Sequence, residues 1–393
     1  MRILYLTHRL PYAPNRGDRI RAHHILRHLS ARHRVDLVSL VHDDDEASHA
    51  ADLEALADST TMVRVGRARA LARAGAALVG GGTLTHALLD GGGFRRRLGA
   101  LLADRRPDVV LAYCSAMARF AMEAPLDACP FVLDLVDVDS EKWAELGGAG
   151  RTPVHWIYRR EARLLRAFER TAIRRARATL VVNARERDLL RTLAADAAVE
   201  VVPNGVDLAA YRAPAAPAGE PRVVFCGVMN YAPNEAGAEW LARVVWPLVR
   251  AARPDAVLTL VGAHPTRRVR DLARGGSIEV TGSVPDVRPY LWRSAVAAAP
   301  LFVARGVQNK VLEALAAGLP AVITPPVAAG LPAEARPACV EAESAGDFAA
   351  RLVALLDKPA AARRAMAATA ALASLEWNHC LGRLDAILAQ AVS

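Results

Sequence analysis

The chain has 393 residues, of which 53% are hydrophobic and 23% are charged. This length suits about two domains of roughly 100 to 200 residues each and excludes a small disulfide-stapled module. The balance of hydrophobic and charged residues excludes a mainly disordered chain. The net charge of +9 comes almost wholly from arginine in an alanine-rich chain, which indicates compositional bias, so we expect no nucleic-acid partner.

The five cysteines are widely spaced and form no CxxC or Cys/His pattern, so we expect free thiols and no metal site. The apolar run near Met1 is too short for the core of a signal peptide. The charge-free stretch 314–331 is broken by several prolines and glycines, which argues against a membrane span. We therefore expect a cytoplasmic protein.

Strand and helix patterns alternate along the chain, which predicts parallel sheets covered by helices. In the first half the expected strands are 2–7, 35–41, 61–65, 108–112, 131–135, 179–182 and 199–202. A stretch rich in proline and alanine at 211–221 then predicts an interdomain linker. The strands expected after it are 222–226, 256–261, 277–280, 295–299 and 321–323.

These patterns predict an α/β fold of two Rossmann-like domains. The expected boundaries are 1–210 for the first domain, 211–221 for the linker and 222–358 for the second domain. The helical segment 359–393 can pack back on the first domain.

The densest motif lies in the second half, where RGVQNKVLEALAAGLP occupies residues 305–320, and PNGVD at 203–207 precedes the expected linker. Together these two motifs resemble the donor half of glycosyltransferase family 4, whose members have the GT-B fold. The segments THRLPYAPNRGDRIR (7–21), DVDSEKW (137–143) and GVQNKVLEA (306–314) further resemble sugar transferases of bacterial exosortase and exopolysaccharide clusters. The resemblance covers residues 1–360.

The resemblance implies an acceptor domain followed by a donor domain, with parallel sheets facing each other across a cleft. It implies transfer of a sugar from a nucleotide-diphosphate donor to a hydroxyl acceptor, with retention and without a metal. The nucleotide sugar is then a co-substrate, and no separate cofactor is expected. The expected acceptor is a saccharide, in particular a lipid-linked one used in exopolysaccharide synthesis.

A departing diphosphate needs cations and amide donors where its negative charge develops. Gly17 and the loop 306–310 can supply amides at helix N-termini, with Lys310 and Arg305 as cations. The resemblance implies that Glu313 accepts hydrogen bonds from ribose hydroxyls, and the alternative is an acid that serves the helix dipole. The other expected donor-binding residues are Gly227, Val284, Gly306, Asn309 and Leu312.

The chain departs from the family's E-x7-E pattern, because Arg305 stands eight residues before Glu313. An arginine there favours a phosphate or an acidic sugar, so we predict that Arg305 alters the donor contact and acts in catalysis. The family's arginine and lysine after the first donor strand are also missing, and we expect Arg305 and Lys310 to replace their charge. A second E-x7-E, at Glu161 and Glu169, lies in an arginine-dense helix and is interpreted as coincidence.

In the first half the family places a histidine after the strand 131–135, where this chain has Asp137. A carboxylate at this place can orient a sugar hydroxyl or act as a base toward the acceptor, which makes Asp137 a catalytic candidate. The alternative is a structural cap for the helix that begins near Ser140. Further acceptor-side candidates are Asn15, Arg16, Asp139 and Lys142.

Residues 151–177 hold nine arginines and two glutamates, with aromatic and aliphatic residues between them. Such a helix can lie on an anionic membrane surface and meet a lipid-linked acceptor, which would make the protein peripheral at the inner face of the cytoplasmic membrane. The alternative is a solvated arginine-rich helix.

Two other functions are consistent with the same motifs. A nucleotide-sugar 2-epimerase can share this architecture and would need no acceptor. A non-catalytic, sugar-nucleotide-binding partner of a polysaccharide assembly complex would explain the missing glutamate and cations.

Overall fold

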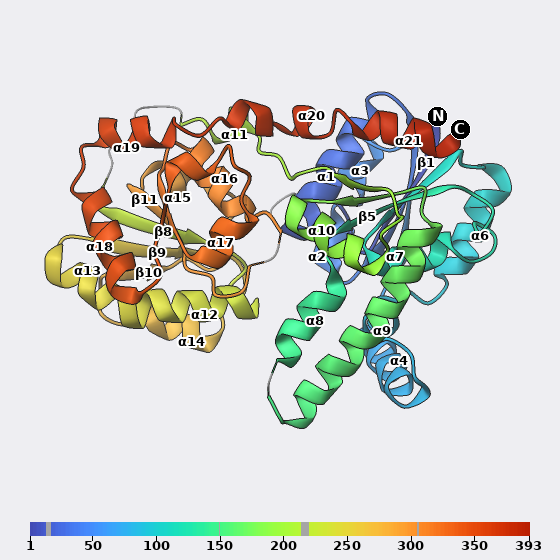
Figure 1. The fold of residues 1–393 in the computed structure, drawn as a ribbon, viewed down its shortest axis with the longest axis horizontal. Helices are drawn as coiled ribbons and strands as arrows, with labels where there is room; N and C mark the ends of the chain where they lie inside the picture. Colours follow the sequence, from blue (N-terminus) through green and yellow to red (C-terminus); the bar gives the residue numbers. More distant parts are fainter. Residues whose placement is uncertain (13–16, 149, 214–219, 305) are drawn as a thin grey trace. The chain divides into compact units, whose positions relative to one another are not determined.

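The computed structural model describes residues 1–12, 17–148, 150–213, 220–304 and 306–393. They form two compact units (Figure 1), one of Met1–Val202 with Leu381–Ser393 and one of Pro203–Cys380. Each unit is built on a parallel β-sheet covered by helices, which confirms the predicted α/β class with two Rossmann-like domains.

The sheet of the first unit has the strand order β3-β2-β1-β4-β5-β6-β7. Its central strands are mainly apolar and are buried along almost their whole length, as expected when helices cover both faces. The order reverses between β1 and β4, which makes this the switch point where ligands usually bind. The strands are β1 (Arg2–Thr7), β2 (Arg34–Val41), β3 (Ser59–Arg64), β4 (Val109–Tyr113), β5 (Phe131–Val136), β6 (Ala178–Val181) and β7 (Val199–Val201).

The helices of the first unit include one from the far end of the chain, α21 (Leu384–Val392), which packs on β4 and β5. Its Asp385 carboxylate lies 3.2 Å from the ring nitrogens of both His28 and His33. The other helices are α1 (Gly17–Ser30), α2 (Asp44–Ser48), α3 (Ala50–Glu54), α4 (Arg67–Gly80), α5 (Leu84–Leu88), α6 (Phe94–Asp104), α7 (Ser115–Ala121), α8 (Asp139–Gly147), α9 (Pro153–Arg175) and α10 (Ala184–Leu193).

Helices α8 and α9 form a hairpin that extends away from the first sheet, with α4 beside α9 (Figure 1). Arg160 of α9 donates hydrogen bonds to the carbonyl oxygens of Ala77 and Gly82 at the end of α4. Glu161 accepts from the backbone N–H groups of Leu84 and Thr85, both at 2.8 Å, and so caps α5. The arginine-rich helix α9 is therefore joined to its neighbours by its buried polar residues.

A buried ion pair lies beneath the carboxyl end of β5. Arg21 of α1 donates to both carboxylate oxygens of Asp134, at 2.8 and 3.1 Å, and to the carbonyl oxygen of Val202 at 2.8 Å. Both side chains are fully buried. Two residues further, Val136 has a φ of +66°, a costly conformation for a β-branched residue. The ion pair and this local kink fix where Asp137 leaves the sheet.

The second unit repeats the design with the strand order β10-β9-β8-β11-β12-β13. Its switch point lies between β8 and β11. The strands are β8 (Arg222–Cys226), β9 (Val257–Val261), β10 (Ile278–Val280), β11 (Val296–Ala299), β12 (Ala321–Ile323) and β13 (Cys339–Glu341). The α-helices are α11 (Leu208–Tyr211), α12 (Ala232–Trp240), α13 (Trp246–Ala252), α14 (Arg267–Arg270), α15 (Arg288–Trp292), α16 (Asn309–Ala316), α17 (Pro325–Gly330), α18 (Ala345–Leu356), α19 (Ala360–Ala367) and α20 (Trp377–Cys380). Four short helical turns are of other types, a π-helix at Leu241–Val245 and 3-10 helices at Asp271–Ala273, Arg336–Ala338 and Leu372–Leu375.

Every expected strand is present, with bounds that differ by no more than two residues. The edge strand β13 was not predicted, because its short sequence is only partly buried and has no strong apolar pattern. Among the described residues, no helix is long and apolar enough to cross a membrane.

The two compact units meet at a different place from the predicted linker. The chain passes from the first unit to the second between Val202 and Pro203, so Tyr211 already belongs to the second unit. There its carbonyl oxygen accepts a hydrogen bond from Trp292 Nε1 at 2.8 Å, and that of Ala210 accepts one from Arg288 at 3.0 Å. These contacts hold α11 on α15, while residues 214–219 of the predicted linker lie outside the described residues.

The C-terminal boundary also differs from the prediction. The segment up to Cys380 packs with the second unit, where Val206 N–H donates to the carbonyl oxygen of Leu375 at 2.8 Å. Only Leu381–Ser393 joins the first unit.

Candidate functional site

Two loops flank the switch point of the second sheet. One follows β8 and begins at Gly227, and the other follows β11 and leads to α16. Because ligands of open α/β sheets bind outside the carboxyl ends of the strands at this point, these loops define the candidate donor site.

The loop after β8 packs closely against the loop after β9, and each of the two loops requires a glycine. A Cβ at Gly227 would lie 2.7 Å from Asn234 Nδ2, and one at Gly262 would lie 1.8 Å from the carbonyl oxygen of Gly227. Gly262 also has a φ of +150°. Asn234 in turn donates to the carbonyl oxygen of Val228 at 3.0 Å, which fixes its side chain at the start of α12.

Lys310 on α16 brings a cation to this loop. Its Nζ donates to Asn234 Oδ1 at 2.6 Å and lies 4.8 Å from the centre of the Phe225 ring. Burial lowers the pKa of Lys310 to about 8, against the opposing charges of Cys226 and Glu313. Lys310 thus brings a positive charge to the loop after β8. The resemblance implies an arginine and a lysine in this loop, and this chain has neither there.

Glu313 follows Lys310 by three residues on the same face of α16. The hydroxyl of Tyr211 donates a hydrogen bond to its carboxylate, and burial raises the pKa of both groups. Tyr211 was missed because it begins the segment interpreted as a linker. The capping residue Asp207, whose Oδ1 accepts from Ala210 N–H at 3.0 Å, is the sequence signal for α11 that could have located it.

The N-terminus of α16 faces the PNGVD motif. Asn204 Nδ2 donates to Asn309 Oδ1 at 3.0 Å, while Asn309 Nδ2 is buried with no hydrogen-bond partner in the described structure. Gly205 is held against the C-terminal segment, since a Cβ there would lie 2.8 Å from the backbone of Trp377. A helix N-terminus with an unsatisfied amide is suited to an anion.

The other expected donor residues differ in what they can contribute. Gly306 is buried and has a φ of +64°, so it shapes the loop before α16. Leu312 is fully buried, and only its main chain can reach a ligand. Val284 lies half-buried in the loop after β10. Arg305 lies outside the described residues.

In the first unit, Gly17 begins α1 at the carboxyl side of β1, and Asn15 and Arg16 lie outside the described residues. Asp137 and Asp139 follow β5. Lys142 Nζ lies 3.3 Å from Asp137 Oδ2 and 3.3 Å from Asp139 Oδ1. Asp139 Oδ2 also accepts a hydrogen bond from Ser115 Oγ at 2.8 Å. The structure therefore brings three expected acceptor-side residues together.

Asp137 does not cap α8, which was the alternative to a role in the site. Glu186 accepts from Val138 N–H at 2.9 Å and Glu169 accepts from Ser140 N–H at 3.0 Å, so two glutamate side chains satisfy the start of this helix. Asp137 Oδ1 is buried and has no hydrogen-bond partner in the described part of the chain. The described residues also contain no cluster of histidine, cysteine or acidic residues that could hold a metal ion.

Comparison with known families agrees with this division into two halves. Residues 16–205 match the family described as "Glycosyl transferase 4-like domain", and residues 220–358 match "Glycosyl transferases group 1". The two matches together span most of the chain and correspond to its two sheets. The protein is a glycosyltransferase of the GT-B class. Within that class its first half is a glycosyl transferase 4-like domain and its second half a group 1 domain.

Solved structures share this fold across the whole chain. Sucrose-phosphate synthase from Thermosynechococcus elongatus has a TM-score of 0.75 at 17% identity and covers 99% of both chains. HepE from Anabaena in complex with UDP-glucose has a TM-score of 0.68 at 12% identity, also covering 99% of both chains. A trehalose-phosphate synthase from Burkholderia vietnamiensis has a TM-score of 0.64 at 14% identity and covers 99% of this chain and 100% of its own. No curated protein sequence matches at a significant level.

Proposed function

We propose that this enzyme transfers a sugar from a nucleoside-diphosphate donor held by the second unit to a hydroxyl of a saccharide acceptor held by the first. The observation that carries the proposal is that Lys310 and Glu313 lie on one face of α16, at the switch point of the group 1 domain. Solved structures of HepE contain UDP and UDP-glucose, so a uridine-diphosphate sugar is the first donor to test.

The bond between the anomeric carbon and the diphosphate breaks in this reaction, and negative charge develops on the leaving group. The ammonium of Lys310 and the N–H groups at the start of α16 would neutralise that charge. Glu313, held by the Tyr211 hydroxyl, would accept hydrogen bonds from the ribose. We propose retention and no metal requirement, as the resemblance implies.

The acceptor hydroxyl gives up its proton as the new bond to the anomeric carbon forms. The Asp137 carboxylate is partly exposed, and its Oδ1 has no hydrogen-bond partner among the described residues, so this carboxylate would accept the proton of that hydroxyl. We propose a lipid-linked saccharide of exopolysaccharide synthesis as the acceptor. Its support is the resemblance of three segments together with the arginine-rich helix α9.

The test is calorimetric binding of UDP, GDP and ADP to the full chain. We expect selective binding of one nucleotide, weakened about tenfold or more in Glu313→Ala, because a ribose contact to a charged group is worth more than 1 kcal/mol. Glu343→Ala, which removes an exposed acid of the same unit, serves as the matched control. The absence of nucleotide binding, or equal loss in both variants, would contradict the donor site.

The same preparations, given the sugar conjugate of the bound nucleotide and a saccharide acceptor, separate the two halves of the site. Asp137→Asn should lower the rate of nucleotide release by about a hundredfold while nucleotide binding stays unchanged. Conversion of the donor into an epimer without any acceptor would overturn the proposal.

A further inference from the structure

Helix α4 carries an unusual surface. It consists of alanine, glycine, leucine, valine and three arginines, and it contains no acidic residue. Only Ala70 is buried, while Leu71 is 59% and Val79 91% exposed. A surface helix normally turns its apolar residues toward the protein, so this exposed apolar surface indicates an interaction site.

The α8–α9 hairpin extends this apolar surface. Leu146 at the end of α8, and Val154 and Trp156 at the start of α9, are each about half exposed. Arg160, one turn after Trp156, joins α9 to α4 through the carbonyl oxygens of Ala77 and Gly82. We call Leu71, Val79, Leu146, Val154 and Trp156 the apolar tip.

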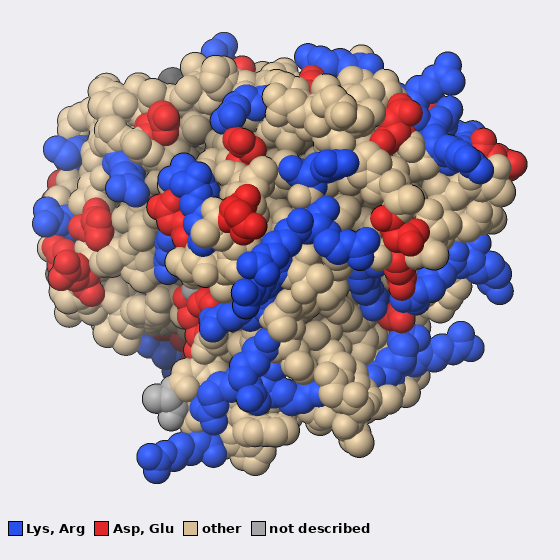
Figure 2. Space-filling view, turned by 45° about the vertical axis from the view of Figure 1, so that its right-hand side comes forward, with Lys and Arg blue, Asp and Glu red and all other residues tan. Residues whose placement is uncertain are grey.

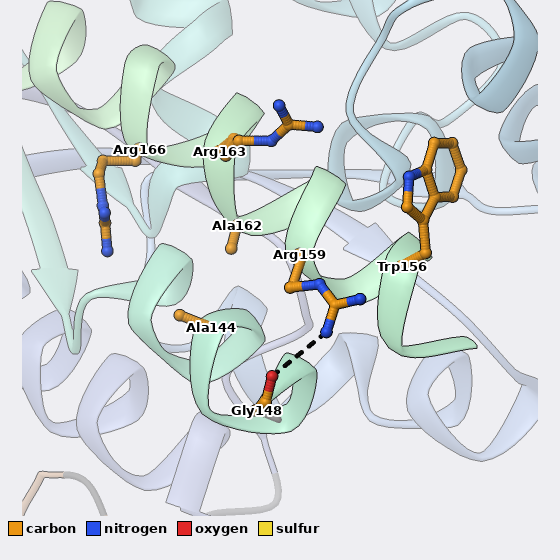
Figure 3. Close-up of a pocket in the computed structure, with 7 residues that line it drawn as sticks. All are labelled: Ala144, Gly148, Trp156, Arg159, Ala162, Arg163 and Arg166. Carbon is orange, nitrogen blue, oxygen red and sulfur yellow. Dashed lines mark hydrogen bonds between the residues drawn. The ribbon is translucent and has the colours of Figure 1, made fainter. Parts of the chain in front are cut away.

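A pocket of about 400 Å³ lies between α8 and α9 beside the apolar tip. Figure 3 shows Ala144 on α8 and Gly148 directly after it, across from Ala162 and three arginines on α9. The lining residues are Ala144, Gly148, Trp156, Arg159, Ala162, Arg163 and Arg166. The spacing of the three arginines places them along one face of α9.

The three arginines differ in the hydrogen bonds and ion pairs that they make within the protein. Arg159 donates to the carbonyl oxygens of Gly147, Gly148 and Gly150. Arg166 pairs with Glu141. Within the described residues, Arg163 makes no hydrogen bond or ion pair, so its guanidinium is available to a ligand.

Little negative charge lies around this pocket. Both acids of α9, Glu161 and Glu169, are fully buried and cap other helices, so its exposed charges are all arginines. On α8, Glu141 is paired and Glu145 is exposed. Figure 2, turned to bring the first unit forward, shows basic side chains gathered over its lower part, where α4, α8 and α9 lie in Figure 1.

We propose that the apolar tip and the arginine pocket form a site for anionic membrane lipid, with a lipid phosphate in the pocket and the apolar tip in the interfacial layer. One guanidinium group can donate two parallel hydrogen bonds to two oxygens of a phosphate. Tryptophan prefers the boundary between lipid head groups and acyl chains. A nucleic acid or an acidic peptide would complement the arginines, but it would leave Val79 and Leu71 in water. A lipid surface complements both features.

The position of α8 gives this site a place in the reaction, which rests on the proposed function. The helix begins at Asp139, close to Asp137, and ends at Gly147, directly before the pocket residue Gly148. Its nine residues span about 13 Å. A saccharide attached to a lipid phosphate in the pocket would therefore lie along α8, with its far end toward Asp137.

The test is co-sedimentation of the full chain with phosphatidylcholine vesicles and with vesicles that also contain phosphatidylglycerol. We expect binding only to the second kind, weakened at least fivefold in Arg163→Gln and in Trp156→Ala. Arg174→Gln removes the same charge about 16 Å further along α9 and should bind almost as the parent does. Leu248→Ala, at an exposed leucine of the second unit, is the control for the apolar change.

Two results would overturn the lipid site. These are no binding to either kind of vesicle, whether or not free pyrophosphate is bound, and equal loss in Arg163→Gln and Arg174→Gln. Nucleotide binding by the same preparations separates the two proposals. Nucleotide binding without vesicle binding contradicts only the lipid site, and vesicle binding without nucleotide binding contradicts the proposed function. Unchanged thermal unfolding of each variant shows that the first unit remains folded.

Discussion

Lys310 illustrates how the fold changes the chemistry of a single residue. On a free helix its ammonium would be fully hydrated, whereas here it lies beside Phe225 and Asn234, and burial lowers its pKa to about 8. A diphosphate at the start of α16 would favour the charged form and raise that pKa again. If Lys310 binds the diphosphate as proposed, nucleotide binding is coupled to proton uptake at Lys310.

This coupling predicts a pH dependence. Nucleotide affinity should be nearly constant around pH 7, where Lys310 is protonated, and should fall as the pH rises through 8, where the free enzyme loses the proton. Calorimetry between pH 7 and 9.5 measures the nucleotide affinity at each pH. Lys310→Arg should bind with little pH dependence because its guanidinium stays charged, and Lys310→Met should bind weakly throughout.

Lys358→Met, at an exposed lysine of the same unit, should behave as the parent enzyme. The same decline with pH in Lys310→Arg would show that another group is responsible.

Some residues of the candidate site can be predicted from the sequence and others cannot, for a simple reason. Lys310 and Glu313 belong to one contiguous motif, so their shared helix face can be predicted from spacing. Tyr211 contacts Glu313 from about a hundred residues away, and nothing local in the sequence indicates that contact.

At the scale of single elements, α9 has two different faces. Its exposed arginines were identified from the sequence, but its two glutamates were interpreted as coincidental. The structure buries both, and they cap α5 and α8. Burial, together with the nearby charge of Asp139, raises the pKa of Glu169 to about 8. Glu169 therefore keeps its proton at neutral pH while it accepts from Ser140 N–H.

A raised carboxyl pKa makes the stability of the first unit depend on pH. Between the ordinary value of 4.5 and about 8 the folded state holds a proton that the unfolded chain releases. The free energy of unfolding should fall in this window by up to about 1.4 kcal/mol per pH unit. Glu169→Gln keeps the acceptor for Ser140 N–H but cannot ionise, so its stability relative to the parent should rise from pH 5 to 8 and then level off.

Denaturant unfolding at several pH values measures this difference. Glu54→Gln, at an exposed acid of the first unit, should track the parent. A constant difference between Glu169→Gln and the parent across the window would contradict the raised pKa.

At the scale of the whole molecule, the boundaries of the two units differ from those predicted at 210/211 and 358/359. Leu381–Ser393 completes the first unit, where Leu384 and Leu388 are fully buried. The segment 203–211 contributes Asn204 and Tyr211 to the candidate donor site of the second unit. Cutting the chain at the predicted boundaries would remove part of each unit.

This organisation predicts that a core substitution in α21 affects the first unit and not the donor site. Leu388→Ala should lower the free energy of unfolding of the first unit by about 2 to 5 kcal/mol through the lost contacts and the cavity. Nucleotide affinity should change less than twofold, because Lys310 and Glu313 lie in the other unit. Thermal unfolding with and without nucleotide measures both effects.

Gln390→Ala, at an exposed position of the same helix, should change neither quantity. Loss of nucleotide binding in Leu388→Ala would contradict the assignment of α21 to the first unit.

The sequence by itself determined the class of fold and the core of the donor motif. Both depend on local periodicity and on contiguous residues, from the buried strand 222–226 to the run that ends in Glu313. Only the tertiary structure decided the unit boundaries, the Tyr211–Glu313 and Lys310–Asn234 contacts, and the pocket beneath the apolar tip. These features depend on how helices and loops pack against one another, which local patterns in the sequence do not specify.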